Sequence, residues 1–216
     1  MKVLFVDVRK AHLNAVCEEE VWVELPSEFW EWGRFARLRR WLYGMRKAAS
    51  GWEDDYARRL EGCGFRRGVG APTVFWNKAT GVRVVVHGDD FTFAGVRKEL
   101  DRMKNEMENW YDVKLRGIMG SGEGETREMT ILGRTVRWTT EGLEYWADDK
   151  HRDILMRSEG LREDSKLVTC PVSRSEEKEE EGDEVELKGE DAKEYRALGA
   201  RLNYLGQDRS DIPVCH

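Results

Sequence analysis

The chain has 216 residues, of which 40% are hydrophobic and 36% charged, and its formal net charge is −6. This length is enough for one large packed domain or for one and a half small ones, and no apolar run approaches the ~20 residues of a membrane-spanning helix. Four scattered cysteines without a CxxC pair argue against a zinc site and a disulfide framework. The first residues, MKVLFVDV, form an apolar run that is too short for a signal peptide and is interrupted early by a charge. We therefore expect an intracellular, cytoplasmic protein.

The first third of the chain is predicted to hold one strand and two helical stretches. The apolar, β-branched run KVLFVDV at 2–8 is typical of a buried strand. Apolar residues recur at helical spacing over 38–45, and again over 52–63 after the weak breakers Ser50 and Gly51.

The middle of the chain is predicted to contain strands, turns and one helix. The segment TVFWNKATGVRVVVHGDDFTFAG at 73–95 indicates two or three strands, with turns at 77–81 and at the paired aspartates. An apolar stripe with i, i+4 and i+7 spacing predicts a helix over 96–110. The glycine-rich GIMGSGEGE at 117–125 is typical of a loop.

The remaining third is predicted to be less compact and more acidic. Residues 175–216 hold 13 acidic and 6 basic residues, so the negative charge belongs to the tail. Runs of like charge are usually solvated. We expect a hairpin with strands at 129–138 and 143–146 and its turn at 139–142, a short helix at 148–158, an acidic linker at 175–191, and a final helix within 192–216.

The order of elements up to residue 138 predicts an α+β, ferredoxin-like βαββαβ arrangement. A right-handed crossover would leave the first two strands of this pattern parallel. The strand after the aspartate turn would then return beside the first strand. Asp7 ends that first strand, and Asp89 and Asp90 lie in the turn, so three carboxylates from distant parts of the sequence are expected to converge on one sheet edge.

Converging carboxylates have two interpretations. Like charges a few ångströms apart disfavour one another, and no lysine or arginine lies within 84–95 to neutralise them. A hard divalent cation such as Mg²⁺ is the natural partner, since it prefers oxygen ligands, and a pair of ions would support phosphoryl transfer. The alternative is ordinary hairpin chemistry, because aspartate is a common turn residue.

A basic cluster with interleaved aromatic residues lies between 34 and 47. It contains no acidic residue and includes Trp41 and Tyr43. One interpretation is the polar face of a helix, and the other is a surface that faces nucleic-acid phosphates. The basic residues are Arg34, Arg37, Arg39, Arg40, Arg46 and Lys47.

Seven collinear segments resemble copia-type (Pseudoviridae) LTR-retrotransposon reverse transcriptases, in a truncated and diverged form. The resemblance covers nearly the whole chain in order, which is more specific than any single motif. The segments are FVDVRKAHLNA (5–15) with VWVELPSEF (21–29), RLRRWLYGMRKAASGW (37–52), GCGFRRGVGAPTVFW (62–76), VVVHGDDFTFAG (84–95), MTILGRTVRW (129–138), CPVS (170–173) and EYRALGARLNYLGQDRSDI (194–212).

The resemblance implies RNA-directed DNA synthesis by two-metal nucleotidyl transfer. Asp7 and Asp89 would be the main ligands of two Mg²⁺ ions, for which Mn²⁺ could substitute, and Asp90 would support them. Further roles follow by position in the family's motifs: Lys10, Ala11, His12 and Lys47 would line the incoming deoxynucleoside triphosphate, and Leu132 and Gly133 would lie near the hairpin that grips the primer. On the phosphate-facing interpretation of the basic cluster, the residues that contact nucleic acid would be Arg34, Arg37, Arg39, Arg40 and Arg46.

The resemblance also implies a domain organisation and a set of partners. Residues 1–138 would form the palm without its fingers, 139–174 a thumb-like hairpin and helix, and 192–216 a helix of the connection region. The partners would be an RNA/DNA template-primer, deoxynucleoside triphosphates and the rest of a polyprotein, namely fingers, RNase H and integrase, with no membrane. A virus-like particle or the nucleus would be further compartments.

Several positions depart from the family's pattern. His12 stands where the family has Phe or Tyr, Lys47 replaces a glutamine, Ala49 replaces a proline, and His87-Gly88 replaces tyrosine-valine. Together with the missing fingers, these changes predict a weak or inactive polymerase when the chain is alone. Two other functions stay open: a non-catalytic remnant that keeps a nucleic-acid-binding surface, and a ferredoxin-like interaction module with an acidic tail.

Overall fold

The computed structural model describes residues 1–30, 32–147, 149–162, 164–166, 186–207 and 209. The chain divides into two units, Met1–Arg127 and Glu128–His216. Helices occur with antiparallel sheets, so the α+β prediction is confirmed at that level. The segment CPVS at 170–173, and the acidic linker up to residue 185, lie outside the described residues.

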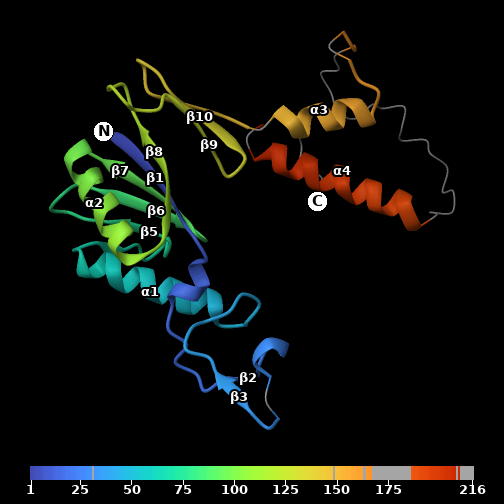
Figure 1. Cartoon of the computed structure of the whole chain (residues 1–216). Helices are drawn as coiled ribbons and strands as arrows, with labels where there is room; N and C mark the ends of the chain where they lie inside the picture. Colours follow the sequence, from blue (N-terminus) through green and yellow to red (C-terminus); the bar gives the residue numbers. More distant parts are fainter. Residues whose placement is uncertain (31, 148, 163, 167–185, 208, 210–216) are drawn as a thin grey trace. The chain divides into compact units, whose positions relative to one another are not determined.

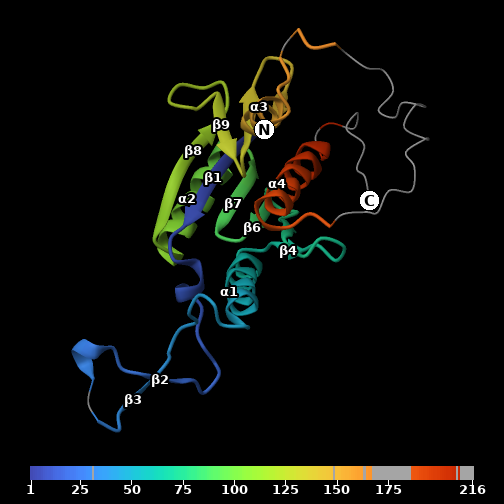
Figure 2. The same cartoon turned by 90° about the vertical axis from the view of Figure 1, so that its right-hand side faces the viewer.

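A six-stranded sheet organises the first unit. Every pair of neighbouring strands in it is antiparallel, and Figures 1 and 2 show β1 between β7 and β8. The expected return of the strand after the aspartate turn to the side of the first strand is therefore confirmed. In sheet order the strands are β4 (Arg66–Arg67), β5 (Val74–Trp76), β6 (Arg83–His87), β7 (Asp90–Gly95), β1 (Lys2–Val8) and β8 (Val113–Met119).

Two helices cover one face of this sheet and form its core. They are α1 (Ala48–Gly62) and α2 (Arg97–Trp110), and Figure 1 shows both against the sheet. Because side chains alternate along a strand, only every second strand residue joins this core. The core includes Trp52, Tyr56 and Leu60 of α1, Leu100, Met103 and Met107 of α2, and Leu4, Val6, Val8, Val84, Val86, Phe91 and Phe93 of the sheet.

The helical stretch expected at 38–45 is wrong. These residues form turns and a bridge, and α1 begins only at Ala48, with the expected breakers Ser50 and Gly51 inside it. The chain turns at Gly44, whose φ is 88°, and the Trp41 amide bonds to the Ala15 carbonyl rather than to a helical neighbour. The apolar spacing arises because Trp41 and Met45 pack on the core, so the polar face of a helix no longer explains the basic cluster.

Residues 11–40 form an excursion beyond the sheet. It contains two short 3₁₀ helices, η1 (Ala11–Asn14) and η2 (Ser27–Phe29), and the paired strands β2 (Trp22–Glu24) and β3 (Phe35–Arg37). A bridge between Val16 and Arg40 closes its base.

The glycine-rich segment at 117–125 is only partly a loop. Strand β8 continues through Met119, and the loop follows it. Within the loop, the Glu125 carboxylate folds back, so a Cβ at Gly120 would lie 2.3 Å from Glu125 Oε2, and one at Gly122 2.9 Å from it. A side chain at either position would therefore require this carboxylate to move.

The second unit contains a three-stranded sheet and two helices. The strands are ordered β11 (Leu143–Trp146), β10 (Arg134–Trp138) and β9 (Glu128–Ile131). The single strand expected at 129–138 is wrong, because a tight turn at Leu132-Gly133 divides it into β9 and β10. The last strand of the expected βαββαβ arrangement, which lies beside β1 in the first sheet, is β8 instead. Helices α3 (Asp149–Ser158) and α4 (Gly189–Gly206) pack together. None of the described helices combines the length and apolar character that a membrane crossing requires.

Candidate functional site

Asp7 and Asp90 face one another across two neighbouring strands. In the register of β1 and β7, Asp7 pairs with Asp90, and Val6 pairs with Phe91. Val6 and Phe91 belong to the core beneath the helices, so by alternation both aspartates point to the opposite face of the sheet. Each side chain keeps about a quarter of its surface exposed, 24% for Asp7 and 25% for Asp90.

The turn before β7 carries Asp89 and is held from two sides. Gly88 has a φ of 64°, a conformation that suits glycine because it lacks a Cβ. The Trp52 indole N–H on α1 donates to the Gly88 carbonyl at 2.8 Å. The backbone N–H of Val8, just after Asp7, donates to the Asp89 carbonyl at 2.9 Å. The three aspartates are therefore gathered at one end of β1.

A bulge in β8 places a positively charged side chain, that of Arg116, at this cluster. Val6 pairs with Leu115, whereas Phe5 pairs with Gly117, so Arg116 is the extra residue between them. A bulge of this kind leaves one residue out of the ladder and redirects its side chain.

Arg116 contacts both facing aspartates through one nitrogen. Its Nη2 donates to Asp7 Oδ2 at 3.0 Å and lies 3.4 Å from Asp90 Oδ1. No lysine or arginine lies within 84–95, around Asp89 and Asp90, but the fold brings one from a strand more than a hundred residues away from Asp7. The carboxylates therefore have an internal partner that the local sequence does not reveal.

Burial and charge act in opposite directions at this cluster. Burial raises the pKa of Asp90 above its ordinary value, Arg116 partly opposes that rise, and the negative charges of Asp7 and Asp89 add to it. The pKa of Arg116 is raised, chiefly by its hydrogen bond to Asp7. The negative charge of Asp90 therefore carries a burial cost that Arg116 offsets in part.

The donor set suits a hard divalent cation as a two-carboxylate site. Oxygen atoms of Asp7 and Asp90 already lie within contact distance of the same cationic nitrogen, and Mg²⁺ is commonly held by one or two carboxylates plus substrate phosphates. Among the described residues, no group of three or more His, Cys, Asp or Glu side chains is arranged to hold a metal ion. Asp89, in the adjoining turn, adds a third negative charge to this cluster.

The turn after β1 presents Lys10, Ala11 and His12. Lys10 has a φ of 52°, Ala11 is buried, and the side-chain amide of Asn14 donates to the carbonyls of Arg9, Lys10 and Ala11. His12 stacks on Tyr43, with the ring centroids 4.3 Å apart.

Stacking fixes the orientation of the His12 ring. His12 Nδ1 is buried, and it has no hydrogen-bond partner among the described residues. The His12 ring is thus packed against an aromatic ring from the basic cluster, that of Tyr43.

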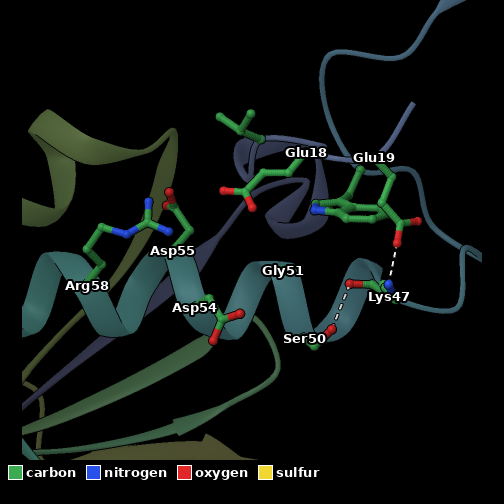
Figure 3. A pocket seen from close by; sticks show the side chains of 10 residues that line it. Glu18, Glu19, Lys47, Ser50, Gly51, Asp54, Asp55 and Arg58 are labelled. Atoms are coloured by element: carbon green, nitrogen blue, oxygen red, sulfur yellow. Dashed lines mark hydrogen bonds and ion pairs between the residues drawn. The ribbon is translucent and has the colours of Figure 1, made fainter. Parts of the chain in front are cut away.

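Lys47 lies in an acidic pocket of about 350 Å³ beside α1. Its Nζ pairs with the Glu19 carboxylate, and this hydrogen bond raises the pKa of Lys47. Figure 3 shows Glu18 and Asp54 among the other side chains around the pocket. Since the pocket's acidic residues outnumber its basic ones, a triphosphate would be repelled from it, and Lys47 could meet a nucleotide only outside it.

The arginines of the basic cluster lie along an irregular surface with exposed aromatic rings beside them. Arg37 ends β3, Arg34, Arg39 and Arg46 lie in turns or coil, and Arg40 donates to the Asn14 carbonyl. The exposed aromatic residues of this excursion are Trp22, Phe29, Trp30, Trp32 and Phe35.

Leu132 and Gly133 belong to the second unit and form the turn between β9 and β10. Both have positive φ, 49° and 74°, as a two-residue hairpin turn of type I′ requires. Arg134, next in the chain, lies over the rings of Tyr145 and Tyr204, at 5.8 and 4.9 Å from their centroids.

Two residues of the site were missed by the sequence reasoning. Arg116 is one of two basic residues in the alternating stretch VKLRGIM, and nothing local marks it as a partner of Asp7. The sequence placed Trp52 in a helical apolar stripe without a role at the site. A buried indole N–H needs a hydrogen-bond acceptor, and this requirement could have indicated that Trp52 contacts a backbone carbonyl such as that of Gly88.

Comparison with known proteins adds no family to this geometry. No protein-family model matches the chain, and no curated protein matches it. We therefore base the function on the geometry of the site and on the resemblance of the sequence motifs.

Proposed function

We propose that the chain is the palm part of a copia-type reverse transcriptase, which transfers a nucleotide from a deoxynucleoside triphosphate to a primer 3′-hydroxyl. The observation that carries this proposal is the pairing of Asp7 with Asp90 on neighbouring strands, with Asp89 in the adjoining turn.

The topology of the first unit supports a ferredoxin-like palm. The strands β6, β7, β1 and β8 are neighbours in that order, α1 lies in the connection from β1 to β6, and α2 connects β7 to β8. This is the order that a βαββαβ unit produces when its third strand returns beside its first.

The chain's own residues would position the reaction. Asp7 and Asp90, with Asp89 beside them, would hold Mg²⁺, which supplies activation of the primer hydroxyl and charge neutralisation of the leaving pyrophosphate. Trp52 and the Val8 amide fix the turn that carries Asp89. The rigid ring of His12 lies just after β1, where it can contact the sugar of a nucleotide placed at the aspartates.

Primer extension on an RNA template tests the proposal. We expect weak Mg²⁺-dependent extension by the chain, and its loss in Asp7→Asn and Asp89→Asn. Asp101→Asn, which changes an exposed carboxylate of α2 that pairs with Arg97, is the matched control and should retain activity. Extension that survives in Asp7→Asn would contradict the proposal.

A second candidate function is sequence-tolerant binding of single-stranded nucleic acid. The exposed aromatic rings of residues 22–35 favour it, because bases stack on such rings beside a basic surface. Trp32 keeps 86% of its surface exposed and lies edge-on to Trp30 at 6.1 Å. Trp32→Ala should weaken binding of a labelled oligonucleotide by about 1–3 kcal/mol, and Trp76→Ala, also exposed, should not.

A further inference from the structure

Arg116 occupies the space between the two facing carboxylates. A cation bound to Asp7 Oδ2 would lie at roughly 2.1 Å from that oxygen, and the Arg116 nitrogen lies 3.0 Å from the same atom. The two positive groups would then be no more than about 5 Å apart. Because like charges repel at such a distance, a divalent cation and Arg116 cannot both be held well.

Because Arg116 lies in the bulge, its side chain can move away from the aspartates without breaking the pairing of the strands. As the extra residue of β8, it has no register partner on β1, and its side chain is 37% exposed. Gly117, which follows it, has a φ of 120°, a conformation that a residue with a Cβ rarely adopts. The side chain can therefore swing toward solvent while the strands stay paired.

We infer that Arg116 is an internal counter-ion that competes with a divalent cation for Asp7 and Asp90 and must be displaced before the cation binds. Without a cation, Arg116 keeps two like charges together at the strand ends. When a cation arrives, the guanidinium leaves and its hydrogen bond to Asp7 is lost. The inference rests on the proposed function, because it concerns the same carboxylates.

Cation titration tests the inference without any need for catalysis. The probe is Mn²⁺, followed by electron paramagnetic resonance on the full chain, with Mg²⁺ as competitor. Arg116→Gln should bind Mn²⁺ about tenfold more tightly than the unmodified chain, since one competing charge-assisted hydrogen bond is removed. Arg102→Gln, an exposed arginine of α2, is the matched control and should not change the affinity.

The outcomes separate the inference from the proposed function. Equal affinity in Arg116→Gln and the unmodified chain, with binding abolished by Asp7→Asn, would overturn the competition and leave the metal site intact. Binding that is absent in both proteins, or that survives Asp7→Asn, would overturn both the inference and the proposed function.

A stability readout guards against misfolding of the variant. In EDTA, Arg116→Gln should melt at a lower temperature than the unmodified chain, because its carboxylates have lost their partner. Saturating Mg²⁺ should raise its melting temperature more than that of the unmodified chain. An equal Mg²⁺-induced shift in both proteins would overturn the inference.

Discussion

The indole N–H of Trp52 donates to the carbonyl of Gly88 at 2.8 Å, 36 residues away in the sequence. Trp52 is almost completely buried and touches Tyr56, Phe91 and Tyr111 edge-on. One side chain of α1 therefore joins the aromatic core to the turn that carries Asp89. Packing of the helix and placement of the carboxylates are linked through this bond.

Trp52→Phe should lower both stability and any activity of the site. The substitution keeps an aromatic ring but removes the donor and part of the volume, so we expect a loss of about 1–2 kcal/mol in the free energy of unfolding. Denaturant unfolding measures the loss. Trp76→Phe, at an exposed position of β5, should leave stability nearly unchanged, and an equal effect of both substitutions would contradict the assigned role.

Tyr111→Phe should destabilise the first unit. The Tyr111 hydroxyl donates to the buried carboxylate of Asp55 at 2.8 Å, and Arg59 donates to the same oxygen at 2.9 Å. Loss of the hydroxyl leaves Asp55 with one donor fewer in a buried position, which costs about 1–3 kcal/mol. Thermal unfolding checks this, with Tyr43→Phe as the control on an exposed tyrosine.

Glu125 should make part of the stability pH-dependent in acid. Its carboxylate accepts from Lys2, from the Gly122 amide and from Arg97, and the Lys2 bond is the main reason that its pKa falls from 4.5 to about 2. A carboxyl whose folded pKa is lowered stabilises the fold above its unfolded value. This contribution should be complete above pH 4.5 and disappear as the pH falls through about 2.

Glu125→Gln identifies that contribution. The variant should be less stable than the unmodified chain at pH 7, and the difference should shrink below pH 4.5. Glu123→Gln, in the same loop and exposed, should unfold like the unmodified chain at every pH. Parallel pH profiles for the unmodified chain and Glu125→Gln would disprove the assignment.

Leu132→Asn should stabilise the second unit. Leu132 adopts a left-handed conformation with a φ of 49° and is 47% exposed, so it bears the strain without burying its whole side chain. A non-glycine residue there costs about 1–2 kcal/mol, and asparagine tolerates the conformation better. We expect the free energy of unfolding to rise by about 1 kcal/mol, as measured by thermal unfolding. A loss of stability would show that the leucine makes contacts that outweigh its backbone strain.

Asp90→Asn should raise stability at neutral pH while removing activity. The pKa of Asp90 is raised, mainly by burial, so ionisation of this carboxyl works against folding, and the penalty is present above its folded pKa. The gain from asparagine should fade as the pH falls through the raised folded pKa and should be gone below 3.8, the ordinary value. Melting temperatures from pH 3 to 8, with Asp101→Asn as control, measure it, and a uniform loss across that range would contradict the expectation.

Local pattern was enough to predict most of the secondary structure of the first unit. Alternating and helical apolar spacing correctly indicated β1, α1, the strands of 73–95 and α2, because one buried face leaves a clear period in a strand or helix. Prediction failed where tertiary contacts set the pattern. Trp41 and Met45 have helical spacing because they pack on the core, and the glycine-rich segment begins inside a strand because β8 pairs with β1 through Met119.

For the site, the sequence by itself indicated that Asp7 lies near the end of a strand and that Asp89 and Asp90 lie where two strands meet, since both follow from short apolar runs and their breaks. The expected bounds were slightly wrong, because β1 continues to Val8 and Asp90 is the first residue of β7, so only Asp89 lies in the turn. Only the tertiary structure decided which cation faces them. Arg116 is separated from Asp7 by 109 positions, and its approach depends on the pairing of β1 with β8 and on a one-residue bulge. Such a register is chosen by the packing of the whole sheet, so no local signal in the chain encodes it.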